Sequence, residues 1–392
     1  MKTITTTLLF AAMLTAGCTS TDNTSKTKIE PHVVHGVNIE PVPAQFSDYS
    51  RAGYDRYVGV KAPNGKSIHI LIMDRLTEHQ IVKAVNVLKH YLEPVSGTEF
   101  GRADQKAKIA NTMANNHAVL KLMNYHDAPK YNDDLDGQPL FEEEIQVEGG
   151  KWYVNQDYNE HRDASYEEIL HLVHDYGIGV HNSPEGNEIA LPNFAKRFNT
   201  IQQNSLHSAY NPPADILKEW QDEVSVDQEY FAAVIDSYYG LWGAFQGEGM
   251  WGMYKVKTRQ DFDTLDPNAK AITEQIFAKT LTYDAYIDDS FTGTFKMRFD
   301  AKVTYTHHSQ YLTKLTLSGS HDSDVQLNQY DNIIKGNSGE NTVVASGARA
   351  DYTIERDSGG QVRLTDTISD RDGTNTLSNI EKIQFTDQTV TL

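Results

Sequence analysis

Cysteine is almost absent from the sequence, since Cys18 is the single cysteine among 392 residues. A disulfide bond within the chain is therefore excluded. The length still allows a substantial hydrophobic core, because roughly 150 residues per domain corresponds to two or three domains. Hydrophobic residues make up 39% of the chain and charged residues 23%. These fractions are close to the globular average and exclude a wholly disordered, collagen-like or multi-span membrane chain.

Basic residues are also scarce, with 35 Lys and Arg against 54 Asp and Glu, which gives a formal net charge of −19. A chain this acidic lacks the excess positive charge that attracts phosphate backbones or anionic lipid surfaces. Nucleic-acid binding is therefore disfavoured. The surplus of carboxylates fits a halotolerant or extracytoplasmic protein, or one that binds hard cations through oxygen ligands.

The N-terminus has the pattern of a secretory signal over residues 1–17: Lys2, an apolar stretch at 8–14, and small residues just before Cys18. The apolar stretch is too short to span a bilayer as a permanent helix. Leu-Thr-Ala-Gly-Cys at 14–18 resembles a bacterial lipobox, which implies lipidation of Cys18. Because Thr19 rather than Asp follows the cysteine, the resemblance to known lipoproteins favours the outer membrane over retention in the inner one. The protein would then face the periplasm or the cell surface. The alternative is a plain signal peptide with an incidental cysteine.

Residues 18–48 are rich in Thr, Ser, Asn and Lys, which predicts a flexible tether. The folded part is expected to begin near Tyr49 and to form an α+β domain over 49–290. A β-branched run after Ser67 predicts a strand, and Thr77-x-x-Gln80 is a capping box that opens a helix. Further helices are expected at 103–115, 165–177 and 225–240, and further strands at 117–123, 140–147 and 152–154.

The helix that begins at Ser165 carries three candidate metal ligands. At about 100° per residue, His171 and His174 lie within about 40° of Glu167, whereas Glu168 lies about 100° away on the flank. Apolar residues occupy the opposite side of this helix. This arrangement is typical of a helix that rests on a core and presents its polar face to a cleft. The alternative is an ordinary amphipathic helix with solvated Glu and His side chains.

Glu167-Glu-x-x-His171 has the spacing of His-Glu-x-x-His, in which the first and last residues bind Zn²⁺ and the Glu between them acts on water. In this sequence Glu167 and His171 are the ligands and Glu168 is the predicted general base. Glu229 begins a Glu-Tyr-Phe-Ala segment on a later helix and is the candidate for the third ligand. His174 is the candidate for a fourth ligand or a supporting donor.

These two segments resemble the Glu-ligand zincins, and most closely the anthrax lethal factor group. In that group the metal helix reads His-Glu-x-x-His-x-Val-x-Asp-Tyr, and the third ligand heads a Glu-Phe-Phe-Ala segment. The resemblance covers about residues 49–287 and implies a zincin-like, zinc-dependent peptidase with a peptide or protein substrate. The sequence departs from the group at Glu167, which replaces a His and lowers the effective charge of a bound ion.

A second departure lies seven residues before Glu229, where the group has a Tyr that stabilises the oxyanion and this sequence has Asp222. Tyr210, Tyr238 or His207 would have to serve instead. The whole chain is also similar to bacterial proteins that join this metal-helix segment to a haemolysin-type calcium-repeat tail.

The tail, residues 291–392, is predicted to be an all-β module of short Thr/Val/Ile strands separated by Gly, Asn and Asp turns. The segment from Gly336 through Gly339 and Asn341 to Val344 matches most of the calcium-binding nonapeptide G-G-x-G-x-D-x-U-x, and a fainter copy precedes it. The candidate Ca²⁺ residues are Asn332, Gly336, Gly339 and Asn341. The alternative is a purely structural β-sandwich.

Together these patterns predict an exported zinc metallohydrolase, of the peptidase kind, followed by a β-rich module. The competing interpretations are a non-catalytic metal- or calcium-binding surface protein and a purely adhesive module without metal.

Overall fold

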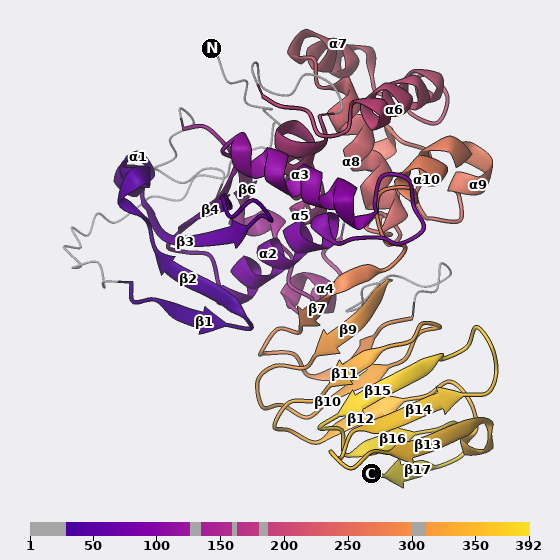
Figure 1. Cartoon of the computed structure of the whole chain (residues 1–392). Coiled ribbons are helices and arrows are strands. Elements are labelled where there is room, and N and C mark those ends of the chain that lie inside the picture. Colours follow the sequence, from indigo (N-terminus) through magenta and orange to yellow (C-terminus); the bar gives the residue numbers. More distant parts are fainter. Residues whose placement is uncertain (1–28, 126–134, 159–162, 180–186, 299–310) are drawn as a thin grey trace, which may run out of the picture.

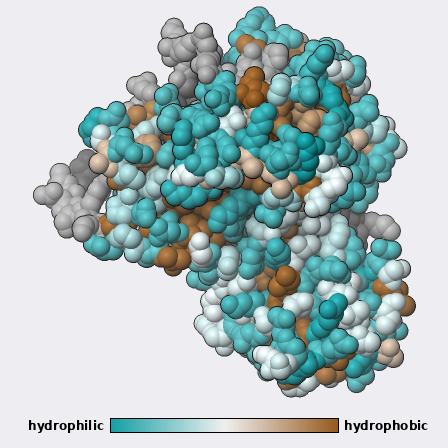
Figure 2. All heavy atoms as spheres, viewed as in Figure 1, coloured by the Kyte–Doolittle hydropathy of each residue, from teal (hydrophilic) through white to brown (hydrophobic). Residues whose placement is uncertain are grey.

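The computed structural model describes residues 29–125, 135–158, 163–179, 187–298 and 311–392. The predicted signal segment 1–17 and the lipidation candidate Cys18 lie outside these ranges. The chain has an α+β arrangement: a sheet with several helices comes first, and a module of strands follows (Figure 1). In Figure 2 the two parts form an upper and a lower lobe with largely hydrophilic surfaces.

A six-stranded sheet organises the first part, in the order β1-β2-β3-β4-β5-β6. The strands from β1 to β4 are antiparallel, and β4, β5 and β6 are parallel. β6 therefore forms one edge of the sheet. Their bounds are β1 His32–Val34, β2 Val37–Pro41, β3 Tyr54–Lys61, β4 Ser67–Met73, β5 Val119–Met123 and β6 Gln138–Phe141.

The predicted tether at 18–48 is wrong for its second half, because β1 and β2 lie within it. Val37 and Ile39 of β2 are buried, and Glu40 pairs with Tyr57 of β3. Val37 and Ile39 alternate with polar neighbours, which is a strand pattern, but the strand is only five residues long. A pattern this short is hard to distinguish within a segment that is otherwise polar.

Helices cover this sheet and extend beyond it (Figure 1). The predicted capping box of α2 is present: Gln80 N donates to Thr77 Oγ1 at 3.2 Å, and Thr77 N donates to Gln80 Oε1 at 3.0 Å. The helices are α1 Ser47–Ala52, α2 Glu78–Leu92, α3 Ala103–Asn115, α4 Lys151–Asn155, α5 Ser165–Val173, α6 Pro192–Ser205, α7 Ala214–Glu223, α8 Val226–Tyr238, α9 Phe262–Leu265 and α10 Pro267–Thr273.

Two predicted strands in this part are wrong. The strand expected at 140–147 ends at Phe141, and a 3-10 turn follows at Glu142–Glu144. Gln80 Nε2 donates to the carbonyls of Glu142 and Ile145, which holds this turn against α2. The segment at 152–154 is helical within α4, because Trp152 and Tyr153 pack into a small aromatic cluster with Tyr158.

From residue 281 onward the described regular elements are strands and a single 3-10 turn, so the β-rich module is observed. Two sheets receive alternate strands as the chain coils, in the orders β17-β16-β12-β10-β8 and β13-β14-β15-β11-β9-β7. Most neighbouring pairs are parallel, for example Ser323 with Asn341, which is the pattern of a coil rather than of an antiparallel sandwich. The antiparallel exceptions are β13, β14 and β17.

The strands of this module are β7 Leu281–Tyr286, β8 Gly293–Lys296, β9 Leu312–Thr316, β10 Ser323–Gln326, β11 Ile333–Lys335, β12 Asn341–Val344, β13 Tyr352–Arg356, β14 Val362–Asp366, β15 Thr374–Ser378, β16 Lys382–Gln384 and β17 Thr389–Thr391. The first of them precedes the expected boundary at residue 291. β7 pairs with β9 and also packs against α2, so it joins the two parts.

Candidate metal centre

Helix α5 carries Glu167 and His171 four residues apart, hence one above the other on one face. Both residues are buried, with exposed fractions of 3% and 8%. Ser165 is the first residue of α5, and Ala164 precedes it without a side-chain capping hydrogen bond. Asp163 holds the helix start instead: its Oδ1 accepts hydrogen bonds from the backbone N (3.2 Å) and Oγ (2.5 Å) of Ser165.

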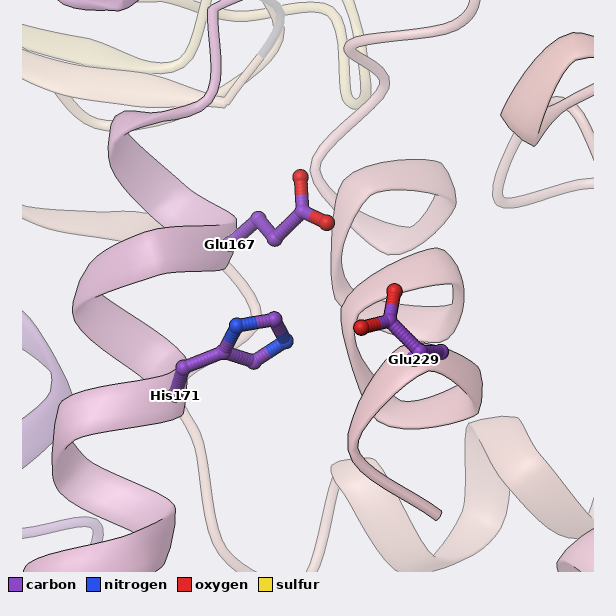
Figure 3. Close-up of side chains that lie close together, drawn as sticks. All are labelled: Glu167, His171 and Glu229. Carbon is purple, nitrogen blue, oxygen red and sulfur yellow. The ribbon is translucent and has the colours of Figure 1, made fainter. Parts of the chain in front are cut away.

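Helix α8 runs beside α5 and brings Glu229 opposite this face (Figure 3). One ligand atom each from Glu167, His171 and Glu229 lies within 4.8 Å of the others. The structure therefore brings together three of the four predicted ligands. As predicted, α8 follows Ser225 and ends before Gly240, which has a positive φ; the Ser225 side chain makes no capping hydrogen bond.

The two nitrogens of the His171 ring have different surroundings. Nδ1 lies 3.7 Å from Glu168 Oε2, which in turn accepts a 2.6 Å hydrogen bond from Gln138 Nε2 of β6. Nε2 is buried and has no hydrogen-bond partner in the described part of the chain. In Figure 3 this side of the ring faces the carboxylate of Glu229. A buried polar atom without a partner costs about 1–3 kcal/mol, which an ion bound there would offset.

His171 has a perturbed pKa because carboxylates surround it. Burial lowers the pKa of the imidazole, but the carboxylate of Glu168, 3.7 Å from Nδ1, and the charges of Glu229 and Asp175 raise it to about 9. Without an ion, one proton on His171 thus balances part of this negative charge. An ion that binds Nε2 must displace that proton.

His174 does not join the group. Regular α-helix ends at Val173, and a π-helical turn follows at His174–Ile178 with a left-handed residue at Gly179, so the helical segment extends beyond its predicted end at residue 177. The His174 ring is completely buried, packs edge-on against Phe231 at 6.0 Å, and has its Nδ1 3.2 Å from Asp175 Oδ1. The structure thus places His174 in the supporting core beside the candidate centre.

Of the three alternatives for an oxyanion-stabilising group, Tyr210 is the best placed. Its hydroxyl is buried without a hydrogen-bond partner among the described residues, and burial together with the charge of Glu229 raises its pKa. The hydroxyl of Tyr238 donates to Glu274 at 3.3 Å, and His207 is exposed. Tyr210 therefore retains a donor near the candidate ligand Glu229.

A buried ionic network that no local sequence pattern predicts supports the start of α5. Lys83 Nζ of α2 lies 2.6 Å from Asp163 Oδ2 and 3.4 Å from Glu148 Oε1. Tyr283 of β7 donates to Glu148 at 3.0 Å, and its hydroxyl lies 2.5 Å from that of Tyr166, the neighbour of Glu167. All five side chains are buried. The network therefore links α2, α5 and the first strand of the β-rich module.

A groove of about 870 Å³ lies elsewhere, between strands β2 and β3 and helices α2 and α3. Hydrophobic side chains such as Val58, Val60 and Val85 line it, and Figure 2 shows brown residues in this hollow. None of the three grouped ligands lines the groove, which separates it from the candidate metal centre.

Of the four predicted calcium residues, Asn332, Gly336 and Gly339 lie in the links between strands of the coil, and Asn341 is the first residue of β12. Asn341 is fully buried: its Nδ2 donates to Ser323 O and Asn337 Oδ1, both at 3.0 Å, and its Oδ1 accepts from Asn337 N at 2.8 Å. Asn332 Nδ2 likewise donates to Tyr330 O and to Asn375 Oδ1. At Asn341 these N–H groups satisfy the oxygens of Ser323 and Asn337, which favours the structural interpretation there. Asn332 Oδ1, in contrast, is buried without a hydrogen-bond partner among the described residues.

The two predicted calcium glycines allow close contact between neighbouring turns. A Cβ atom at Gly336 would lie 1.8 Å from Asn379 O, and one at Gly339 would lie 2.4 Å from His321 O. Their requirement for glycine is therefore explained by packing alone.

We expect Asn341→Asp to make the module depend on Ca²⁺. A carboxylate cannot donate to Ser323 O and Asn337 Oδ1, so the substitution places three acceptors together at about 1–3 kcal/mol for each unsatisfied group. A cation would relieve this, because carboxylate and carbonyl oxygens are Ca²⁺ ligands. Thermal unfolding with millimolar Ca²⁺ and with EDTA measures the effect. If Ca²⁺ raised the unfolding temperature of the wild type as much as that of the variant, the interpretation that the Asn341 amide replaces a cation would be contradicted.

Comparisons with protein-family models, curated proteins and solved structures found no match to this chain. Across the described ranges, no helix combines the length and apolar character needed to cross a bilayer.

Proposed function

We propose that this chain is an exported metallohydrolase, of the peptidase kind, with a divalent transition metal between α5 and α8. The observation that carries the proposal is the convergence of Glu167, His171 and Glu229 within 4.8 Å. The buried His171 Nε2, which has no hydrogen-bond partner among the described residues, supports it further. The order of the two ligand segments along the chain, and a preceding strand and helix, support a zincin-like fold for this domain.

The donor set suits Zn²⁺, which proteins hold with three side chains and an open fourth position at catalytic sites. Two carboxylates would neutralise the charge of a divalent ion. This lowers its power as a Lewis acid relative to a site with two imidazoles, and makes the site less selective against Mn²⁺ or Fe²⁺.

Bound metal would polarise a substrate carbonyl and make a nearby water more acidic. Glu168 is the proposed base: it neighbours the ligand Glu167, and its carboxylate is held by Gln138 at 2.6 Å. It takes a proton from the attacking water and delivers it to the leaving amine. The Tyr210 hydroxyl is the proposed donor to the negative charge that develops on the carbonyl oxygen. The substrate class in this proposal is a peptide or protein.

A non-catalytic metal-binding surface protein is the second candidate, and the two carboxylate ligands favour it because they weaken the ion as a Lewis acid. Cleavage of an unbiased peptide library by the metal-loaded chain separates the two. Cleavage that stops on removal of the metal supports the hydrolase. Full metal occupancy without cleavage of any peptide leaves only the binding protein.

We expect metal binding to release one proton and to strengthen as the pH rises towards about 9, where His171 loses its proton. Below that value the ion competes with the proton, so the apparent Kd should rise up to about tenfold for each unit by which the pH falls. Calorimetric titration with Zn²⁺ at about pH 6 and about pH 7, in buffers of different ionisation enthalpy, counts the released protons. Binding without proton release would contradict this account of His171.

We also propose that Cys18 is lipidated and anchors the chain to the outer membrane of a bacterium. The support is the signal-like segment 1–17 and the lipobox-like residues before the cysteine. In a bacterial host, Cys18→Ser should move the chain from the membrane fraction to the soluble fraction. An unchanged distribution would exclude the anchor.

A further inference from the structure

We propose that Asp175 and Gln228 form a clasp that sets the register between α5 and α8 and thereby positions the ligand Glu229. This inference rests on the proposed metal centre. It concerns two side chains that have no place in the ligand set or in the proposed proton transfers.

The contact itself joins the two helical segments. Gln228 Nε2 donates to Asp175 Oδ1, and this oxygen also lies 3.2 Å from His174 Nδ1. Gln228 is the residue before Glu229, and both lie in the first turn of α8, where their backbone N–H groups donate to Ser225 O at 2.9 and 3.1 Å. A hydrogen bond to Gln228 therefore restrains the same turn of backbone that carries the ligand.

The position of Asp175 follows from the sequence of the metal helix. Glu167 and His171 form a stripe along one face of α5, called here the ligand stripe. Asp175 follows His171 by a further four residues, so it extends this stripe by one turn. Asp175 belongs to the π-helical turn at His174–Ile178. A π turn rotates less per residue than an α-helix, which keeps Asp175 closer to the stripe than regular helix would. Gln228 and Glu229, which are neighbours on α8, thus lie opposite the ligand stripe and its extension at Asp175.

The clasp is suited to positioning Glu229 and contributes little to the stability of the fold. Asp175 and Gln228 are only partly buried, and the Asp175 side chain is 16% exposed, so loss of their hydrogen bond does not open the core. Groups that orient metal ligands typically contribute 10–100-fold to metal affinity. We therefore expect the clasp to affect Zn²⁺ affinity much more than thermal stability.

The test is the Zn²⁺ affinity of the full chain and of Gln228→Ala, which removes the donor without changing the charge of the site. We expect the affinity of Gln228→Ala to fall about tenfold or more. Asp175→Ala should show a similar loss, and Asp175→Asn, which keeps an acceptor oxygen, should recover most of it. In the double variant Gln228→Ala with Asp175→Ala, the two losses should not add.

Asn199→Ala is the matched control. Asn199 of α6 donates to Asp227 at 2.8 Å in the same turn of α8, but this bond does not reach the metal helix. Its loss should leave Zn²⁺ affinity within about twofold, even where it lowers the unfolding temperature. Two results would overturn the clasp but not the metal centre. In the first, the wild type binds Zn²⁺ and Gln228→Ala binds it with the same affinity. In the second, Gln228→Ala and Asn199→Ala lose equal amounts of Zn²⁺ affinity. Failure of the wild type to bind Zn²⁺ would overturn the proposed metal centre and the clasp with it.

Discussion

Lys83→Met is expected to lower the free energy of unfolding by about 3–5 kcal/mol, the usual effect of removing one partner from a buried ion pair. Burial opposes the charge of Lys83, yet Asp163 and Glu148 raise its pKa above the ordinary value. Without the ammonium group, two carboxylates remain in a region where their exposed fractions are 1% and 2%. Urea unfolding of the wild type and the variant measures the difference.

A matched variant on the same helix makes this prediction specific. Lys89 lies on the same helix but is exposed, so Lys89→Met should change the free energy of unfolding by less than about 0.5 kcal/mol. Equal stability of the two variants would show that the network is not the support of α5 that the structure indicates.

Glu168→Gln is expected to retain metal while losing about 10²–10⁴-fold in the rate of peptide cleavage, the usual contribution of a general base. Glutamine keeps an oxygen that can accept the hydrogen bond from Gln138, so the surroundings of the site should persist. Because Glu168 Oε2 also lies 3.7 Å from His171 Nδ1, the rates must be compared with the site saturated in metal.

The control for this variant is Glu219→Gln, an exposed position on α7 that should leave the rate unchanged. If Glu168→Gln cleaves peptides as fast as the wild type at saturating metal, Glu168 is not the base. A fall in metal affinity without a fall in the saturated rate would assign Glu168 to the orientation of His171 instead.

The ligand stripe and its helix could be predicted because they depend on local periodicity. Spacing alone places Glu167 and His171 on one face, and the capping box at Thr77 marks the start of α2. Glu229 could be placed opposite them only through the resemblance of its segment to that of a known group. Pairing between α5 and α8 is a tertiary contact that periodicity does not encode.

The errors have local physical causes. His174 was assigned to the ligand face on the assumption of a continuous α-helix, whereas the chain widens into a π turn after Val173. Strands β1 and β2 were missed because a hairpin at a sheet edge needs few apolar residues. The Lys83 network joins residues far apart in the sequence, and each of its charged members alone is indistinguishable from a solvated residue.

The most direct test of the metal centre is the Zn²⁺ content of the purified full chain after removal of loosely bound ions, measured by elemental analysis. The proposed metal centre predicts one ion per wild-type chain and none in His171→Ala, which removes the single nitrogen donor of the group. His207→Ala, at an exposed histidine, should retain the full content and thereby excludes adventitious surface binding. A wild-type chain without stoichiometric metal, or a His171→Ala variant that holds as much as the wild type, would contradict the account.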